Sequence, residues 1–369
     1  VRKPPREVCG RERARRAAHI ASLVHQGDIE GLRKLAVEGG FMSERIRSIV
    51  WPVLLNVSPV RSRPPEDRKH REQKQVQLDV VRSLTHVGLG EYERNSRLGE
   101  LSFLIDSVLA AHPDLHYYQG FNDVCSTLLV VMQSAPAAFP LAERLATHHL
   151  KEAMTPSMHP VQQALKFILG ILRSEDKQLY QCMLSSDMDP IFCVSWVLTW
   201  FAHDLHSLPA IERMYDFFLA SHPLMVLYFS ASLLRLYRKE LLRTRGDYPE
   251  MHAVMQHLPN NLPLEGLIRA SQRSFTAYPP SSIILAASLQ TERAFVAEES
   301  MWRKYPYPFL IKPEPAPEPR LIEWKPDPPE RRGWMVAIRG GGILATLFFL
   351  EQLVAGRALE VLVSRYLLK

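Results

Sequence analysis

The feature that most constrains the fold of this chain is the spacing of its apolar residues, which recur every three or four positions over residues 15–280. This spacing places them on one face of an α-helix, whereas a half-buried strand would alternate apolar and polar residues. No sustained alternation of that kind occurs in the 369 residues. Prolines recur between the apolar segments, where a helix can begin without losing a hydrogen bond. We therefore predict a single large all-α domain over residues 1–280.

The same periodicity predicts where the individual helices lie. We expect helices at 15–37 with a break at Gly27 and Asp28, then at 46–55, 71–84, 97–111, 117–133, 139–153, 160–174, 176–184, 190–205, 208–220, 223–242, 249–257 and 263–274. Residues 59–70 are polar and rich in proline, which indicates a loop or a helix start. No fixed period of about 34 or 40 residues relates the segments, which argues against a helical-repeat scaffold.

The net charge of +6 comes largely from the N-terminal arm of the predicted domain. Residues 1–20 hold seven arginines and lysines against two glutamates. Two interpretations fit this arm: the solvated start of a helix, or a contact with an acidic membrane surface or an acidic partner. Aromatic residues are not interleaved with the charges and no nucleic-acid motif follows, so we expect no nucleic-acid partner.

Catalysis by the chain alone finds little support in its motifs. The four cysteines form no Cys-x-x-Cys pair and no ligand spacing with histidine, so we expect no metal site. Free cysteines in apolar surroundings suggest a reducing compartment, and nothing at the start of the chain is typical of a secretory signal. Nucleophile-elbow, phosphate-loop, dinucleotide and zinc-protease motifs are all missing.

Two short segments place polar side chains where chemistry would be useful. Asp79 and Arg82 lie three residues apart in a predicted helix and therefore share a face. The simpler interpretation of this pair is a surface ion pair, which contributes little to stability. Tyr117, Gln119 and Asn122 lie at the head of a very apolar helix, where a glutamine is costly to bury unless it is paired or used. The simpler interpretation here is a capped helix start.

With two further residues, these segments resemble the TBC domain of Rab GTPase-activating proteins. Three family signatures occur in order: Arg-x-x-x-Trp at Arg47 and Trp51, apolar-x-x-Asp-x-x-Arg at Val76, Asp79 and Arg82, and Tyr-x-Gln-Gly-x-Asn at Tyr117, Gln119, Gly120 and Asn122. Each signature alone is weak, but all three in this order within a helical chain are specific. Ser83 replaces a threonine usual in the family and Phe121 a methionine, and neither change touches Arg82 or Gln119.

The resemblance implies an enzyme activator that acts on a GTP-loaded Rab GTPase and has no complete active site of its own. Arg82 would neutralise charge on the phosphates as an arginine finger, and Gln119 would position the attacking water. GTP and Mg²⁺ would belong to the Rab, so we expect no cofactor on this chain. The alternative is a non-catalytic adaptor with the same fold that only binds a Rab, and the presence of both Arg82 and Gln119 argues against it.

The remaining signature residues would support these two side chains. The resemblance implies that Asp79 orients the finger and that Arg47 and Trp51 build the scaffold beneath it. Tyr117 and Asn122 would shape the groove that receives the GTPase. Glycine at position 120 would let the two backbones approach closely, because it has no side chain.

The C-terminal part of the chain differs in composition from the helical domain. Residues 281–332 are rich in proline and glutamate and predict a semi-rigid linker. Residues 333–369 are apolar again, but the uncharged run at 340–350 is shorter than the roughly 20 residues that a spanning helix needs. A longer span, 334–350, would include Arg339 near one end. A membrane span, a helix lying on the membrane and a soluble or non-native tail all stay open.

A narrower resemblance bears on location. Residues 213–219, 222–225 and 258–259 resemble one subgroup of the family, in which a C-terminal segment anchors the protein at the endoplasmic reticulum. This resemblance implies a catalytic domain in the cytosol, on the cytoplasmic face of the endoplasmic reticulum or early Golgi membrane. It also implies a role in transport between these two compartments, with residues 333–369 as a candidate membrane anchor.

Overall fold

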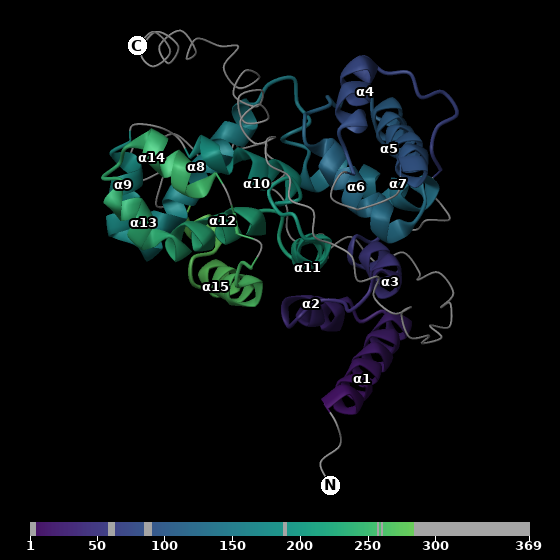
Figure 1. The fold of residues 1–369 in the computed structure, drawn as a ribbon, viewed down its shortest axis with the longest axis horizontal. Helices are drawn as coiled ribbons and strands as arrows, with labels where there is room; N and C mark the ends of the chain where they lie inside the picture. The colour runs from purple at the N-terminus through teal and green to yellow at the C-terminus, as the bar shows by residue number, and fades with distance from the viewer. Residues whose placement is uncertain are drawn as a thin grey trace. The chain divides into compact units, whose positions relative to one another are not determined.

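The computed structural model describes residues 5–57, 63–84, 91–186, 190–256, 258–259 and 261–283, which all belong to one compact unit, Val1–Pro326. Every regular element in these ranges is a helix, which confirms the predicted all-α class (Figure 1). The predicted linker beyond residue 283 and the apolar segment 333–369 lie outside the described residues. Within the described ranges, no helix is both long and apolar enough to cross a bilayer.

The helices follow one another with short connections. The first half of the domain contains α1 (Pro5–Gln26), α2 (Ile29–Val37), α3 (Glu44–Leu54), α4 (Gln73–Val81), α5 (Glu91–Ala111), α6 (Phe121–Met132), α7 (Ala135–Arg144) and a π-helix, η1 (Leu145–His149). The second half contains α8 (His159–Glu175), α9 (Lys177–Leu184), a 3₁₀ turn, η2 (Ile191–Cys193), α10 (Val194–Thr199), α11 (Leu208–Leu219), α12 (Met225–Leu236), α13 (Arg238–Arg243), α14 (Tyr248–Met255) and α15 (Leu264–Ala277).

Helix boundaries differ from the prediction where the backbone takes a left-handed conformation. The helix predicted at 190–205 ends at Thr199, because Trp200 and Phe201 have φ values of 51° and 67°. Both rings are buried in the core, and Phe201 packs against Phe229 of α12 at a centroid distance of 5.1 Å. Burial of two aromatic rings contributes more than the strain of two unusual backbone conformations costs. The helix predicted at 223–242 is divided into α12 and α13 at Tyr237, which has a φ of −92° and is not left-handed.

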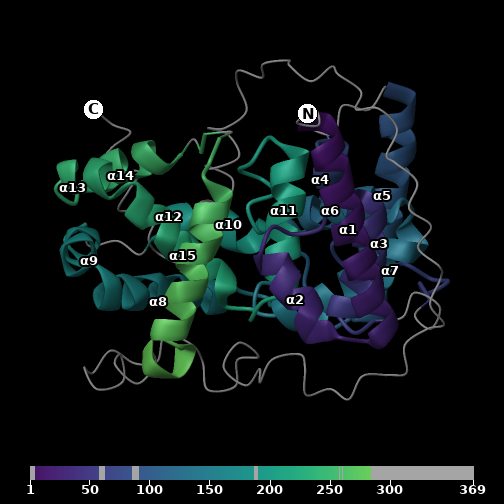
Figure 2. The same ribbon diagram turned by 90° about the horizontal axis from the view of Figure 1, so that it is seen from below.

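The helices pack into two groups that α10 and α11 connect. Helices α5, α6 and α7 pack on one another and carry α4, whereas α8 and α15 both pack on α12. Between these groups, α10 contacts α6 and α12, while α11 contacts α2, α3 and α15 (Figures 1 and 2). Arg82, which follows α4, and Gln119, which precedes α6, therefore both lie in the group formed by α4, α5, α6 and α7.

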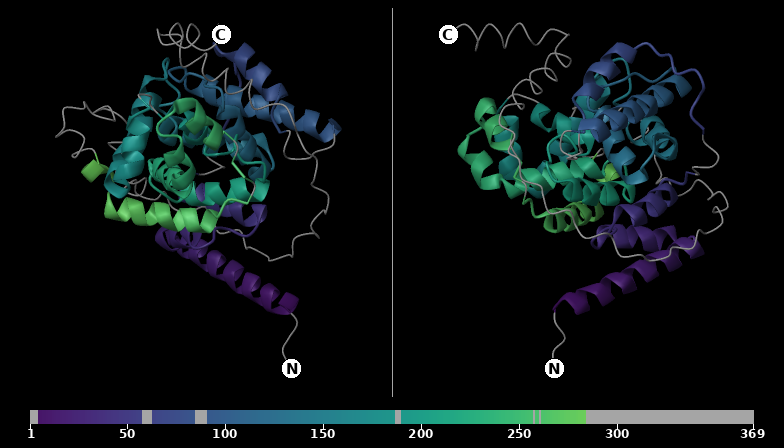
Figure 3. Two further views of the ribbon diagram at one scale, coloured as in Figure 1. Left: turned by 60° about the vertical axis from the view of Figure 1, so that its left-hand side comes forward. Right: turned by 45° about the vertical axis from the view of Figure 1, so that its right-hand side comes forward.

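The two ends of the described chain pack differently. Helix α1 buries Ala17, Ile20 and Leu23, while its N-terminal end projects beyond the neighbouring helices (Figure 3). At the other end, residues 280–283 have helical geometry and Ile283 is buried. A Cβ added at Gly170 of α8 would lie only 2.7 Å from Ile283, so this segment packs closely on the domain. The packed domain thus continues at least to residue 283, past the predicted start of the linker at 281.

Candidate functional site

Arg82 and Asp79 form the pair that their spacing predicted. Arg82 is the residue at the C-terminal cap of α4, and its Nη2 donates a hydrogen bond to Oδ1 of Asp79, one turn earlier. The two side chains differ sharply in exposure: that of Arg82 is 56% exposed and that of Asp79 only 1%. A surface ion pair is therefore the wrong description, because the carboxylate is buried. The exposed guanidinium of Arg82 is therefore held by the buried carboxylate of Asp79.

Asp79 is held from a second segment of the chain. The hydroxyl of Tyr117 donates to Oδ2 of Asp79 at 2.9 Å, and Nε2 of Gln75 lies 3.3 Å from Oδ1. Burial, with the negative charge of Asp79, raises the pKa of Tyr117 well above its usual value. The hydroxyl therefore keeps its proton and remains a donor at neutral pH.

Asn122 joins the same two segments by a separate route. Its Nδ2 donates to Oγ of Ser83 at 3.0 Å, and Ser83 in turn donates to the backbone carbonyl of Asp79 at 2.9 Å. Its Oδ1 accepts from the backbone N–H of Gly120 at 3.0 Å. Asn122 therefore connects the residue that follows Arg82 to the residue that follows Gln119.

Gln119 lies in the turn before α6, and its side-chain amide oxygen is buried without a hydrogen-bond partner among the described residues. A buried acceptor without a partner lowers the stability of the fold, so a functional role would explain its presence. The next residue, Gly120, has φ of 113°, in the region that favours glycine, and α6 begins directly after it. The turn thus holds an amide with a free acceptor at the head of a rigid helix.

Arg94 is a member of this site that the sequence did not indicate. From the first turns of α5, its Nη2 donates to the carbonyls of Val81 at 2.7 Å and of Ser83 at 2.9 Å, one on each side of Arg82. Its Nε lies 3.3 Å from the same Ser83 carbonyl. A backbone carbonyl is present at every position, so no residue type in the sequence signals such a contact.

A second missed residue is His203, which follows α10. Its Nδ1 lies 3.1 Å from Oδ2 of Asp123 in the first turn of α6. Burial lowers the pKa of His203, but the hydrogen bond and charge of Asp123 outweigh this effect and raise it to about 9. The positive charge of Arg82 opposes the protonation, so the two cations lie within electrostatic reach of each other. His203 therefore adds a second positive charge to this part of the site.

Two exposed apolar residues flank the finger on α4. Leu78 is 64% exposed and Val81 is 65% exposed, and they belong to a small set of large apolar side chains that the described part of the domain leaves in solvent. Because both lie within one turn of Arg82, they form an apolar surface beside an exposed guanidinium. A protein partner would cover such a surface, whereas a small solute would not.

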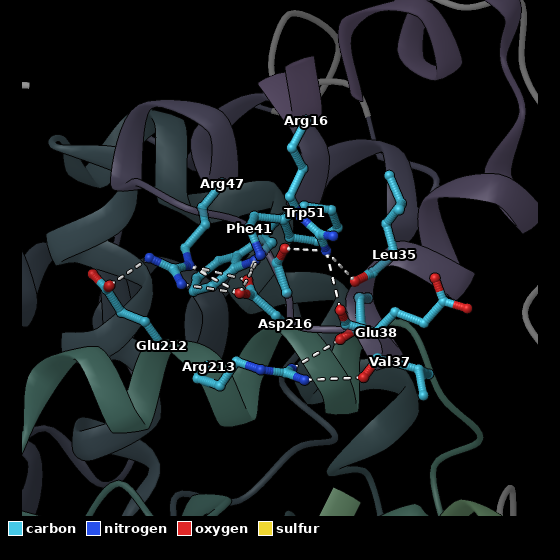
Figure 4. Close-up of polar contacts among 12 residues, drawn as sticks. Arg16, Leu35, Val37, Glu38, Phe41, Arg47, Trp51, Glu212, Arg213 and Asp216 are labelled. Atoms are coloured by element: carbon cyan, nitrogen blue, oxygen red, sulfur yellow. Dashed lines mark hydrogen bonds and ion pairs between the residues drawn. The ribbon is translucent and has the colours of Figure 1, made fainter. Parts of the chain in front are cut away.

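Arg47 and Trp51 lie in a different cluster, which joins α3 to α11 (Figure 4). Arg47 donates to Asp216 through Nε at 3.0 Å and to Glu212 through Nη1 at 2.6 Å. Trp51 Nε1 and the backbone N–H of Phe41 both donate to Asp216 at 2.8 Å. No hydrogen bond described for these residues reaches Asp79 or Arg82, although α3 packs on α6. Their support of the finger stays a prediction.

Figure 4 also shows two arginines that the prediction left out. Arg16 of α1 donates to the carbonyls of Leu35 at 2.9 Å and Gly40 at 3.0 Å, while Arg213 of α11 donates to those of Ala36 at 2.8 Å and Val37 at 3.1 Å. Both therefore stabilise the end of α2, which leads into the Arg47 cluster. Their role is architectural.

Comparison with known proteins identifies the family of the chain. The family model described as the Rab-GTPase-TBC domain matches residues 44–242, which include α3 to α12 and every site residue that the sequence predicted. The chain belongs to this family. The matched range holds Arg47, Arg82 and Gln119, so the three signatures lie inside one TBC domain.

Relatives and solved structures give the same result. The chain is 36% identical over 291 residues to "TBC1 domain family member 20" of Homo sapiens, covering 76% of this chain and 72% of that protein. It is 31% identical over 267 residues to "GTPase-activating protein gyp10" of Schizosaccharomyces pombe, covering 70% and 71%. The crystal structure of the Ypt/Rab-GAP domain of Gyp1p superposes with a TM-score of 0.56 at 15% identity, covering 68% of this chain and 92% of that one. That structure supports the TBC fold.

Proposed function

We propose that this chain accelerates GTP hydrolysis by a Rab GTPase and supplies Arg82 and Gln119 to the reaction in trans. The observation that carries the proposal is an exposed guanidinium on a buried carboxylate, together with a buried amide oxygen in the neighbouring turn that has no partner among the described residues. Membership of the TBC family and the similarity to a GTPase-activating protein of Schizosaccharomyces pombe support it. In this role the chain is an activator, and GTP and Mg²⁺ are bound by the Rab.

Arg82 has the chemistry that phosphoryl transfer needs. Hydrolysis of GTP builds negative charge on the phosphate oxygens, and a guanidinium placed there is always charged and donates from a planar fork. Arg82 is accessible to a partner because more than half of its side chain is exposed. Asp79 holds it before the partner binds, which lowers the entropy lost when the finger inserts.

Gln119 has the chemistry that positioning of the attacking water needs. Its amide oxygen can accept a hydrogen bond from the water, while its Nε2 can donate to a phosphate oxygen at the same time. The oxygen is buried and has no partner among the described residues, so it can turn toward the Rab without breaking a hydrogen bond of its own. Asn122 and Gly120 hold the backbone on which this side chain is mounted.

The apolar pair on α4 supports a protein as the partner. Leu78 and Val81 flank Arg82, so a GTPase that receives the finger would cover both of them. We further propose that the Rab acts in transport between the endoplasmic reticulum and the Golgi, with this chain on the cytoplasmic face of one of those membranes. The support is the resemblance of residues 213–219, 222–225 and 258–259 to one subgroup of the family. Residues 333–369 remain the candidate membrane anchor.

The test is single-turnover GTP hydrolysis by a panel of purified, GTP-loaded Rabs from different compartments, with the full chain. We expect at least one Rab of the secretory pathway to respond, and Arg82→Ala and Gln119→Ala to abolish the response. Loss of an arginine finger lowers the rate by roughly 10³–10⁵-fold. Arg235→Ala is the matched control, since it removes an arginine–carboxylate pair between α12 and Glu175 of α8, at 2.9 Å.

Different outcomes separate the alternatives. If a Rab binds the chain but no Rab is accelerated, the adaptor interpretation replaces the activator. If a Rab responds and Arg82→Ala is as active as the unaltered chain, the finger is assigned to the wrong residue. If only Rabs of other compartments respond, the activity stands and the proposed pathway is wrong.

A further inference from the structure

Arg94 donates hydrogen bonds to backbone carbonyls on both sides of Arg82. We propose that it is a positioning residue that fixes the orientation of Arg82 for GTP hydrolysis. This inference rests on the proposed function, because it concerns how Arg82 is held when it acts. Nothing in the TBC signatures includes residue 94, which lies between the second and third of them.

The contacts of Arg94 lie where α4 ends. A helix leaves the carbonyls of its last turn without helical partners, and a cation near that end satisfies them and interacts well with the helix dipole. The guanidinium of Arg94 takes this role, with three donor–acceptor distances of 2.7, 2.9 and 3.3 Å to two carbonyls, those of Val81 and Ser83. A planar fork of donors suits two neighbouring acceptors better than a single ammonium does.

Each of the two peptide units that flank Arg82 takes part in at least one hydrogen bond. The N–H of Arg82 donates to the carbonyl of Asp79 at 3.1 Å, and that of Ser83 donates to Val80 at 2.9 Å. Arg94 holds the carbonyl before Arg82 and the carbonyl after it. Together these bonds fix the direction in which the Cα–Cβ bond of Arg82 points.

Backbone anchoring becomes decisive when the finger acts. The guanidinium of Arg82 is held only by Asp79 among its described contacts, and it has to exchange some of this contact for the phosphates of the partner. At that stage the direction of the Arg82 side chain depends on its backbone, and the hydrogen bonds from Arg94 to that backbone do not change. A displacement of about 1 Å in such a group can lower the rate about 10²-fold.

The same helix offers a matched control. Arg97, one turn further along α5, also donates to a backbone carbonyl at a helix end: it reaches the carbonyl of Gln133, the C-terminal cap of α6, at 2.7 Å. It also donates to the side-chain oxygen of Gln133 at 3.0 Å. Replacement of either arginine removes a comparable cap from the domain, but only Arg94 lies beside the finger.

The experiment compares Arg94→Ala, Arg94→Lys and Arg97→Ala in the full chain, with a responding Rab. We expect Arg94→Ala to lower kcat by about 10–100-fold with KM nearly unchanged. The Arg82 side chain loses its fixed orientation, whereas the surface that binds the Rab is kept. Arg94→Lys should recover part of this loss, and Arg97→Ala should leave kcat near that of the unaltered chain.

One result would overturn the inference while the proposed function stands: an equal loss of kcat from Arg94→Ala and Arg97→Ala. If the unaltered chain accelerates no Rab, the proposed function fails, and amide hydrogen exchange then tests the anchoring by itself. Arg94→Ala should speed exchange at residues 82 and 83, and Arg97→Ala should not. Unchanged exchange at these amides would show that Arg94 does not hold the finger segment.

Discussion

The hydroxyl of Tyr117 donates a 2.9 Å hydrogen bond to Oδ2 of Asp79, 38 residues earlier in the chain. Through this contact, the carboxylate that holds the finger on α4 is also bound by the segment that leads to Gln119. The two side chains proposed to act on GTP are thus mounted on one hydrogen-bonded network. A change at Asp79 should therefore affect stability and activity together.

Asp79→Asn should lower both the free energy of unfolding and kcat. The change removes the charge that attracts Arg82 and places an amide N–H₂ among donors, which leaves buried polar groups unsatisfied at a cost of about 1–3 kcal/mol. Tyr117→Phe removes a single neutral donor and should cost about 0.5–1.5 kcal/mol. Urea denaturation and single-turnover hydrolysis measure the two effects. Unaltered stability and rate in Asp79→Asn would contradict the role of the buried carboxylate.

Gln119→Ala should abolish activity with little loss of stability, because the amide oxygen that it removes has no hydrogen-bond partner among the described residues. We expect the free energy of unfolding to stay within about 0.5 kcal/mol of the unaltered chain. Asn122→Ala is the contrasting variant, since it removes the bonds to Ser83 and Gly120 and should cost about 1–3 kcal/mol. Equal destabilisation by both changes would mean that Gln119 is satisfied internally.

Leu78→Ser and Val81→Ser should weaken binding of the Rab and leave kcat unchanged. Both side chains are about two-thirds exposed beside Arg82, so the folded domain loses little when they become polar. Apolar residues at the centre of an interface contribute about 1–2 kcal/mol or more, which corresponds to roughly 5–30-fold in KM. Leu236→Ser, at a 47% exposed position on α12, is the control. An equal KM in all three variants would place the Rab elsewhere.

His203 should make stability depend on pH between about 6.5 and 9. Its pKa in the folded domain is raised to about 9, so the protonated form stabilises the fold fully below pH 6.5, and this contribution is lost as the pH rises through 9. Asp123 and Asp204 favour the charge and Arg82 opposes it. The ring is 37% exposed, so solvent screening should limit the effect to below about 1 kcal/mol.

The measurement for His203 is the free energy of unfolding at several pH values in that range. His203→Asn and Asp123→Asn should each flatten the dependence relative to the unaltered chain, because each removes one member of the pair. If the three proteins lose stability in parallel as the pH rises, another group is responsible for the dependence.

Asp216→Ala should cost stability and, because Arg47 and Trp51 are predicted to support the finger, lower the kcat of the folded protein. The change leaves the buried guanidinium of Arg47 and the N–H donors of Trp51 and Phe41 without this acceptor, and such a loss typically costs 3–5 kcal/mol. Glu265→Ala removes the 46% exposed partner of Arg213 and should cost below about 1 kcal/mol. An unchanged kcat for Asp216→Ala, measured on folded protein, would show that the Arg47 cluster does not support the finger.

Much of the site was predictable because its key relationship is local. Asp79 and Arg82 share a helix face through their three-residue spacing, and Gly120 lies at a backbone conformation that glycine favours. The order of the three signatures then placed the chain in its family. The buried state of Asp79 was not predictable, because the helix periodicity around it does not show which neighbours cover a polar residue.

The sequence by itself determined the all-α class, because apolar periodicity is a local property of a chain. Its three signatures resembled the TBC family, and that resemblance implied the residues that carry the proposed chemistry. Only the tertiary structure decided what holds those residues: Tyr117 on Asp79, Asn122 on Ser83, and Arg94 on the carbonyls beside Arg82. It also placed Arg47 and Trp51 on Asp216, 169 and 165 residues away. Such partners meet through packing of distant helices, and a carbonyl acceptor is the same at every position, so no pattern of residue types encodes them.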